Sequence, residues 1–255
     1  MARRKRDFVR VAGADAEDYL QRMLSQDVAM PVGDAREALL LTARARVIAP
    51  MIVLRRSHDD YLLSTEPGLG ERIAAELRRA RFAAQVDVEP ELHEAHLVFG
   101  QRPDGVAYPV ADFGEEAWET LDTPFPEDAG TLDDRALEVM RIRARTPATG
   151  REIDDRVLPA EAGLTERAVS FTKGCYPGQE PVARLHYRGR ANRGLRVLAL
   201  DGEPPAYDAP LELDGKDVGR VTSAVADPAG GVLALAYVRR EVPPDAELEL
   251  AHAAA

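Results

Sequence analysis

The first third of the chain alternates between strand-like and helix-like patterns of hydrophobic residues. Continuous or alternating apolar runs predict strands at 8–11, 38–42, 46–56, 61–65 and 85–89. Apolar residues spaced three and four apart predict one helix that begins after Asp15, a suitable N-cap, and a second helix over about 70–81. Strands and helices that alternate at this length indicate an α+β fold with a mostly antiparallel sheet.

The pattern changes twice in the rest of the chain. Residues 101–130 are rich in Pro, Gly, Asp and Glu, which predicts a loop or a domain boundary. We expect the next helix to be capped by Thr131 and to bury Ala136, Val139 and Met140. Short strands separated by Gly, Asp and Pro then predict a small all-β barrel or sandwich that begins near residue 195.

Composition limits the classes of function. The 255 residues carry a formal charge of −11, and an acidic surface repels phosphate backbones unless basic residues cluster locally. The single cysteine excludes an intrachain disulfide and a metal site made of several thiolates of one chain, so we expect a cytoplasmic protein. The basic start MARRKRDFVRV lacks the apolar segment of a signal peptide, and we interpret it as a solvated tail. No apolar run approaches the ~20 residues of a membrane span.

The segment FTKGCYPGQEPVARLHYRGR, residues 171–190, raises the main chemical question. The preceding AVSF, residues 168–171, predicts a strand that leads into a glycine-rich turn. Pro181 suits the first turn of a helix that ends near Arg188. The cysteine of this segment is therefore expected on a turn, directly before a helix.

Cys175 has two interpretations. It lies two residues from Lys173 and near the positive end of the predicted helix, and both features favour the thiolate over the thiol. The alternative is a small buried apolar residue without chemistry. Two glycines, a proline and a lysine around the cysteine are unusual for a core strand, and they favour the reactive interpretation.

A basic run follows the cysteine in this acidic chain. It predicts a site for carboxylates or phosphates, because the guanidinium group contacts both in a bidentate manner. The alternative is that arginine is simply the usual surface cation of this chain. The run consists of Arg184, His186, Arg188, Arg190, Arg193 and Arg196.

Other candidate sites are weaker. His93 and His96 with two neighbouring glutamates could ligate a metal, but we interpret them as surface residues and expect no metal site. The chain contains no P-loop, GxGxxG, GxSxG or HExxH motif.

The motif KGCYPGQE resembles the signature of the YgfZ family, folate-binding proteins related to the T-protein (aminomethyltransferase) of the glycine cleavage system. The resemblance also covers DFVRVAGADAEDYLQRMLSQDV, LLLTARARVIAPMIVLR, the stretch from RIRARTPATGREIDD through GRANRGL, and DGKDVGRVTSAV. It leaves residues 90–130 as the part with the weakest match.

The resemblance implies a three-domain cloverleaf around a central folate-sized cavity. Two domains would be α+β and ferredoxin-like, and the third would be a C-terminal β-barrel. The first domain would combine 1–45 with 125–194, the second would span 46–124, and the barrel would span 195–255.

The resemblance also implies which residues hold tetrahydrofolate or a one-carbon derivative of it. Glu161 in LPAEAGL corresponds to a glutamate that holds the pterin ring, and a carboxylate can accept two N–H bonds from such a ring. Arg193 in GRANRGL corresponds to an arginine that reaches the folate, and its charge suits the glutamyl carboxylates. Arg190 is expected to share that task.

One departure bears on catalysis. T-proteins carry a catalytic aspartate in a strand of the form VxDDLIV, whereas Ala49 and Pro50 occupy the corresponding positions of VIAPMIV. We therefore expect no glycine-cleavage activity. The motif ARARV also departs from the lysine–glycine pair of relatives, so no role is assigned to its arginines.

The resemblance implies a cytoplasmic tetrahydrofolate-binding protein that supports assembly or repair of iron–sulfur clusters in client enzymes, including enzymes that modify tRNA. Cys175 would be the reactive group, and Lys173 and Tyr176 would position or tune it. One thiolate cannot hold a cluster that needs four ligands, so a cluster would be shared with a partner. The alternatives are a folate-dependent one-carbon transferase, a direct tRNA-binding factor, and a folate sensor whose Cys175 is structural.

Overall fold

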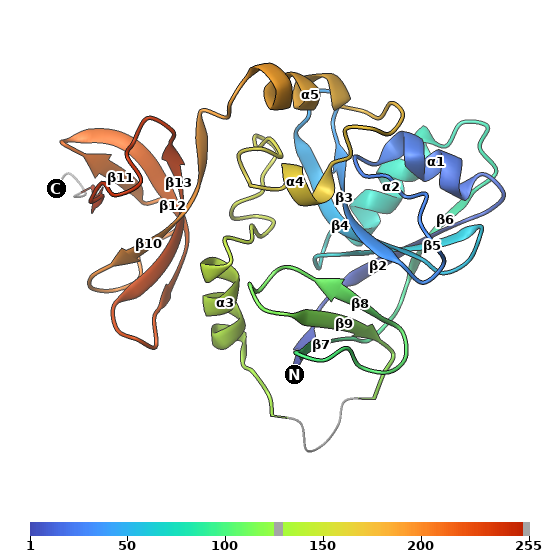
Figure 1. Ribbon diagram of the computed structural model, residues 1–255, viewed down its shortest axis with the longest axis horizontal. Coiled ribbons are helices and arrows are strands. Elements are labelled where there is room, and N and C mark those ends of the chain that lie inside the picture. The colour runs from blue at the N-terminus through green and yellow to red at the C-terminus, as the bar shows by residue number, and fades with distance from the viewer. Residues whose placement is uncertain (125–129, 252–255) are drawn as a thin grey trace.

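The computed structural model describes residues 1–124 and 130–251 as a mixed α/β protein that consists mostly of antiparallel sheet (Figure 1). Its helices are α1 (Ala16–Met23), α2 (Gly70–Ala80), α3 (Asp134–Arg143), α4 (Thr165–Ala168) and α5 (Gln179–Arg188). Its strands are β1 (Ala2–Arg4), β2 (Asp7–Ala12), β3 (Ala35–Leu41), β4 (Val47–Arg55), β5 (Asp60–Thr65), β6 (Asp87–Glu91), β7 (Ala95–Phe99), β8 (Ala107–Val110), β9 (Ala117–Leu121), β10 (Arg193–Leu200), β11 (Pro210–Leu213), β12 (Lys216–Ala226), β13 (Val232–Arg239) and β14 (Glu249–Leu250).

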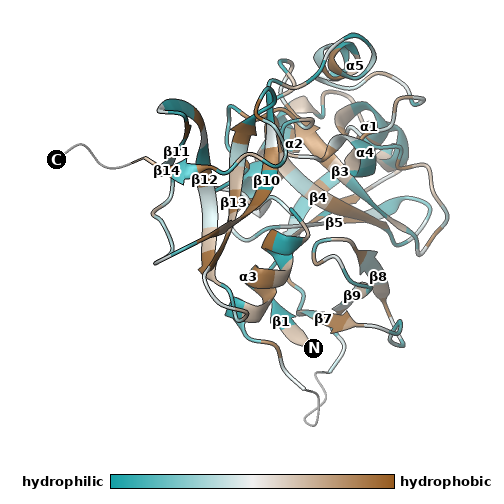
Figure 2. Cartoon of the chain, turned by 60° about the vertical axis from the view of Figure 1, so that its left-hand side comes forward, coloured by the Kyte–Doolittle hydropathy of each residue, from teal (hydrophilic) through white to brown (hydrophobic). Residues whose placement is uncertain are grey.

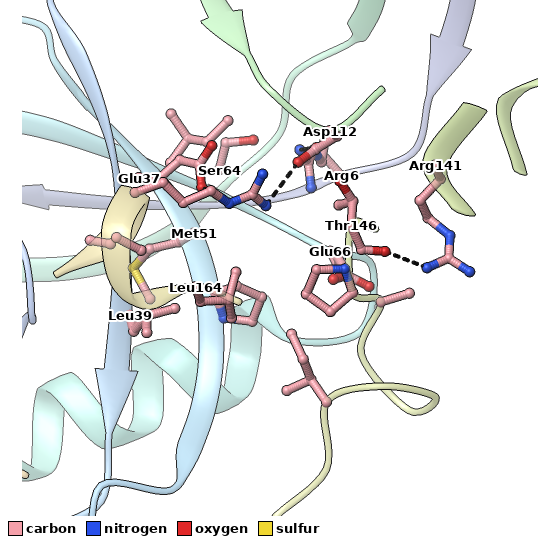
Figure 3. Close-up of a pocket in the computed structure, with 18 of the residues that line it drawn as sticks. Arg6, Glu37, Leu39, Met51, Ser64, Glu66, Asp112, Arg141, Thr146 and Leu164 are labelled. Carbon is pink, nitrogen blue, oxygen red and sulfur yellow. Dashed lines mark hydrogen bonds and ion pairs between the residues drawn. The ribbon is translucent and has the colours of Figure 1, made fainter. Parts of the chain in front are cut away.

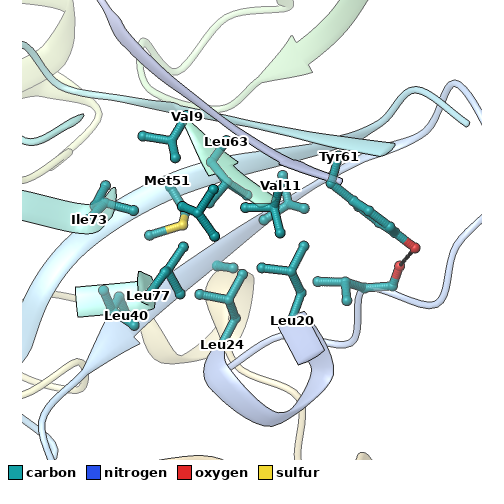
Figure 4. Close-up of a cluster of buried hydrophobic side chains, with 14 of the residues drawn as sticks. Val9, Val11, Leu20, Leu24, Leu40, Met51, Tyr61, Leu63, Ile73 and Leu77 are labelled. Atoms are coloured by element: carbon teal, nitrogen blue, oxygen red, sulfur yellow. Dashed lines mark hydrogen bonds between the residues drawn. The ribbon is translucent and has the colours of Figure 1, made fainter. Parts of the chain in front are cut away.

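The first sheet has the order β3-β4-β5-β2-β6, and all its pairs are antiparallel. Helices α1 and α2 pack against it through apolar side chains spaced three and four apart, such as Leu20, Ile73 and Leu77 (Figure 4). The five strands and two helices predicted for this region are confirmed. Asp15 precedes α1, but its carboxylate accepts a hydrogen bond from the Gln85 N–H instead of capping the helix.

The second sheet, β1-β7-β9-β8, corrects two predictions. The basic N-terminus is not a solvated tail, because β1 pairs with β7 and Ala2 is buried. Residues 101–130 are not one loop, because β8 and β9 lie within them; the part at 125–129 lies outside the described residues. These strands bury Tyr108, Ala117 and Leu121 in a core that they share with residues of the first sheet such as Ile52 and Leu62.

The expected domain limit at 45/46 falls in the hairpin between β3 and β4. These strands are neighbours in one sheet, with Leu39 paired to Pro50. The limit near 195 falls close to Arg193, where β10 begins.

The segment between the second and third sheets differs in detail from the prediction. Asp133, not Thr131, caps α3, and its carboxylate accepts a hydrogen bond from the Ala136 N–H at 2.8 Å. Val139 of this helix is buried as expected, whereas Ala136 is only half-buried. The stretch 168–171 is not a strand: Ser170 instead donates its N–H to the Ser25 carbonyl.

The turn and helix expected after the cysteine are present. Helix α5 contains Pro181 in its first turn and ends before Gly189. Gly178 adopts a left-handed conformation with φ of 83°, and a Cβ there would lie 2.6 Å from the Thr42 carbonyl oxygen. Only glycine fits this contact between the cysteine turn and the β3–β4 hairpin.

The third sheet, β10-β13-β12-β11-β14, contains the five strands expected near the C-terminus. No pairing among residues 1–124 and 130–251 joins β10 to β14, so the sheet is open and the expected barrel is not confirmed. Strand β13, between β10 and β12, is buried from Val232 to Val238, and Figure 2 shows brown, hydrophobic residues along it. Helix α3 packs Val139 and Ile142 against Leu233 and Leu235 and so joins this sheet to the rest.

Within the part of the chain that the structure describes, we find no helix long and apolar enough to cross a membrane.

Candidate functional site

The largest cavity near the expected folate residues lies between the 158–167 loop, α5 and the start of β10. Its volume is about 620 Å³, within the range of roughly 300–1,000 Å³ that is usual for small-molecule sites. Its walls include Glu161 and Arg190 together with apolar residues such as Leu158, Val182 and Leu195. Two of the three residues expected to bind folate therefore line one cavity.

The third residue, Arg193, is paired with Glu161. Its Nε donates to Glu161 Oε1 at 3.1 Å and its Nη2 donates to Oε2 at 3.3 Å. Glu161 Oε2 also accepts the Leu158 N–H at 3.0 Å, and the Arg193 guanidinium lies 4.7 Å from the centre of the Tyr237 ring. A carboxylate has about four acceptor positions, and three are in use here. A ligand that donates two hydrogen bonds to Glu161 must therefore displace at least one of these contacts.

The cavity has a predominantly cationic rim. Arg190 is exposed, and Arg145, Arg167 and His186 also line the walls. Among the walls, Glu166 is the acid other than Glu161. A chamber with apolar walls, two carboxylates and several guanidinium groups has the chemistry that a pterin ring with a carboxylate-bearing tail requires, so these residues fit a folate.

Lys173 does not point at the neighbouring cysteine. Its ammonium donates to the carbonyl oxygens of Leu24 and Gln26 at 2.8 and 2.7 Å, and so ties the turn to the segment after α1. Burial lowers the pKa of Lys173 to about 8, and Asp27 opposes this shift. Among the described residues, no contact joins Lys173 to Cys175 through which it could tune a thiolate. Its two hydrogen bonds do, however, position the turn.

The two other residues of this motif differ in exposure. Cys175 is exposed, as expected for an accessible thiol. Tyr176 is buried, its ring lies 5.5 Å from the Lys173 ammonium, and burial raises the pKa of its hydroxyl to about 12. Neither side chain lines the 620 Å³ cavity. Cys175 therefore faces solvent on a turn that Lys173 and Tyr176 anchor.

A second cavity, of about 180 Å³, is lined by residues of the first sheet such as Met51 and Ser64 and by Asp112 after β8, and we call it the central cavity (Figure 3). Pro50 lines it, at a position where T-proteins carry an acid, whereas Ala49 is buried in the core of the first sheet. Pro147 and Arg167 line both cavities, so the two lie side by side. Strand β4 therefore contributes no carboxylate to the central cavity at Pro50.

A buried charge network borders this central cavity. Arg4 and Arg6 each contact Glu119 at 3.0 Å, and Glu119 is fully buried. Asp112 pairs with Arg4 and with Arg167, whose Nε also contacts Glu37 at 2.7 Å. The network joins the N-terminus, the second sheet and α4.

The network explains the ionisation of its acids. Burial alone would raise the pKa of Asp112, but Arg4, Arg6 and Arg167 hold it at about 2. Burial raises the pKa of Glu37, and Arg167 only partly offsets this effect.

Sequence analysis missed this network and a similar one around Arg141. That arginine contacts Glu138 and Glu152, and Ser223 donates to Glu152 at 2.7 Å. The partners lie far apart in the sequence, so no local motif marks them. His93 contacts Asp122 and Glu91, and the described residues contain no cluster that could hold a metal ion.

Comparison with known proteins agrees with the motif and the fold. The family model described as the GCVT N-terminal domain matches residues 7–98. An uncharacterized protein of Haemophilus influenzae is 29% identical and is matched over 86% of this chain and 81% of its own length. The "tRNA-modifying protein YgfZ" of Edwardsiella ictaluri is 28% identical, with 95% and 85% covered.

A solved structure shares the fold. The glycine cleavage system aminomethyltransferase T of Bartonella henselae superposes with a TM-score of 0.78 at 20% identity, over 93% of this chain and 77% of that protein. The chain therefore has a T-protein-like fold. In motif and sequence the chain is similar to YgfZ-type proteins, which are related to the aminomethyltransferase superfamily.

Proposed function

We propose that this protein binds tetrahydrofolate, or a one-carbon derivative, in the 620 Å³ cavity. The observation that carries the proposal is that Glu161 and Arg190 line one chamber with apolar walls and that Arg193 is hydrogen-bonded to Glu161. Glu161 would accept the N–H groups of the pterin, and the two arginines would bind the glutamyl carboxylates. The pairing of Glu161 with Arg193 keeps both charges satisfied before the ligand binds.

The experiment on the arginines uses three proteins in an anaerobic binding titration with tetrahydrofolate. Arg193→Ala removes a charge-assisted contact worth about 1.5–3 kcal/mol, so affinity should fall by roughly tenfold or more. Arg72→Ala removes an exposed arginine of α2 and serves as the matched control. Unchanged affinity in a folded Arg193→Ala protein would show that this arginine does not bind the ligand.

We further propose that the folate complex supports assembly or repair of iron–sulfur clusters in client enzymes, including enzymes that modify tRNA. The relatives named as tRNA-modifying proteins and the exposed Cys175 support this role. Cys175 would meet the partner's cluster, while Lys173 and Tyr176 hold its turn in place. Cells that carry only the Cys175→Ala protein should lose iron–sulfur enzyme activity; full activity would indicate a folate sensor with a structural cysteine.

The main alternative is a folate-dependent one-carbon transferase. Pro50 at the central cavity disfavours it, because the carboxylate of the aminomethyltransferase reaction is missing on β4. Turnover with a one-carbon donor would establish the alternative.

We also propose a three-domain layout with a C-terminal barrel, and a cytoplasmic location. The three sheets support the three-domain layout.

A further inference from the structure

One face of α5 carries exposed basic and aromatic side chains. Arg184, Tyr187 and Arg188 stand at positions i, i+3 and i+4 of this helix and therefore lie on the same side of it. All three are exposed, and 67% of the Tyr187 surface is accessible. Within the described part of the chain neither arginine has an ion-pair partner. We call these three residues the α5 face.

Two aromatic rings, those of Phe171 and His186, pack against Tyr187 of the α5 face. The rings of Phe171 and His186 are stacked at 3.9 Å with an interplanar angle of 20°. The Tyr187 ring meets His186 edge-on at 4.8 Å and Phe171 at 5.9 Å. Tyr187 is thus braced by two rings while most of its own surface stays open to solvent. A fixed and exposed ring of this kind is a platform on which another flat ring can stack.

The charge around the α5 face opposes that of the whole protein. The chain carries a net charge of −11, yet the segment from Lys173 to Arg196 contains six Lys or Arg residues and one acid, Glu180. A local positive surface on an acidic protein attracts a polyanion to that surface and repels it elsewhere. Because no carboxylate among the described residues pairs with Arg184 or Arg188, both are available to phosphates.

A hollow of about 380 Å³ continues the face at Arg184. Tyr176 and Gly178 form part of its wall. Tyr176 is only 6% exposed, and its hydroxyl has no hydrogen-bond partner among the residues that the structure describes. Such a buried hydroxyl lacks a partner that polar groups in protein interiors normally have.

We propose that the α5 face binds single-stranded RNA, with Arg184 and Arg188 on the phosphates and a base stacked on Tyr187. An acidic protein partner would account for the arginines but not for the braced, exposed ring, whereas single-stranded nucleic acid needs both. The choice of RNA over DNA rests on the proposed role in tRNA modification.

The test is fluorescence anisotropy with a labelled, unstructured RNA of about 20 nucleotides, over a range of salt concentrations and without folate. A single strand contributes about 0.7 to the salt slope per phosphate contacted, so R184Q/R188Q should reduce the slope by about 1.4. Y187A should weaken binding by about fivefold or more, and Y187F should restore it, because stacking of one base contributes at least ~1 kcal/mol. R72Q/R240Q removes two exposed, unpaired arginines elsewhere and should leave the slope unchanged.

Three outcomes would overturn the proposal. The first is an equal loss of slope in R72Q/R240Q, which would show a diffuse charge effect. The second is equal binding of polyglutamate, which would indicate an acidic protein partner. The third is a single-stranded DNA of the same sequence that binds as tightly as the RNA. Melting curves confirm that each variant is folded, and because folate is absent, failure here leaves the folate titration as a separate test.

Discussion

The buried network around Glu119 provides a prediction of stability. Glu119 is fully buried and contacts two guanidinium groups, those of Arg4 and Arg6, at 3.0 Å each, and Ser64 donates to it at 2.9 Å. Glu119→Gln keeps the size and one acceptor oxygen but removes the charge. Two buried guanidinium groups would then share Asp112 as their remaining acid, which contacts Arg6 at the longer distance of 3.7 Å.

The cost follows from the energetics of broken buried ion pairs. Removal of one partner from such a pair costs about 3–5 kcal/mol. Because Asp112 still neutralises part of the charge of Arg4 and Arg6, we expect a cost near the lower limit. A loss of about 3 kcal/mol lowers the melting temperature of a protein of this size by roughly 6–12 °C. Differential scanning calorimetry measures the shift.

The matched control is Glu115→Gln, which removes the same charge from an exposed residue close to Glu119 in the chain. It should shift melting by no more than about 2 °C, as is usual for surface substitutions. A Glu119→Gln protein that melts within 2 °C of the wild type would refute the reasoning, because the guanidinium groups would then not depend on this carboxylate.

Three further outcomes are expected. Because the pKa of folded Asp112 is about 2, below its ordinary 3.8, its stabilising effect is complete above about pH 5 and is lost as the pH falls toward 2. The free energy of unfolding in urea should therefore differ less between the wild type and Asp112→Asn at pH 3 than at pH 5. A difference that stays constant over this range would contradict the prediction. Cys175 should be alkylated by iodoacetamide without denaturant, since it is exposed, and a requirement for denaturant would show a buried thiol. No methylenetetrahydrofolate should form from an aminomethylated lipoyl carrier, since Pro50 replaces the acid, and formation well above background would disprove this.

The elements with a strong local pattern were predictable from the sequence. Helix α2 buries Ile73 and Leu77 one turn apart, and the first sheet consists of long apolar runs. Helix α5 has Pro181 in its first turn and a glycine at its end. In each case the local preference and the tertiary packing agree, so the sequence pattern alone identifies the element.

Elements whose partners lie far away in the sequence were not predictable. Strand β9 carries Glu119 in an acidic segment; it pairs with β7 and β8, and Arg4 and Arg6 from the N-terminal segment neutralise the buried charge of Glu119. The stretch 168–171 has apolar residues but forms no strand, because Ser25 supplies hydrogen bonds to its backbone.

The candidate site shows the same limit. The motif resemblance indicated Glu161 and Arg193 separately, and the structure shows that they pair with each other across the junction between the 158–167 loop and β10. The direction of the Lys173 side chain, away from Cys175 and toward Leu24, depends on packing against α1 that no local pattern encodes.

The central claim is that Glu161 holds a folate in the 620 Å³ cavity, and anaerobic titration calorimetry with tetrahydrofolate tests it most directly. The wild type should bind with micromolar affinity. Glu161→Ala should weaken binding by at least tenfold, because a contact to a charged group contributes about 1.5–3 kcal/mol. Glu166→Ala removes the other acid of the same cavity and should bind within about threefold of the wild type, since such a surface change costs little. No heat of binding in the wild type, or equal affinity in a folded Glu161→Ala protein, would contradict the claim.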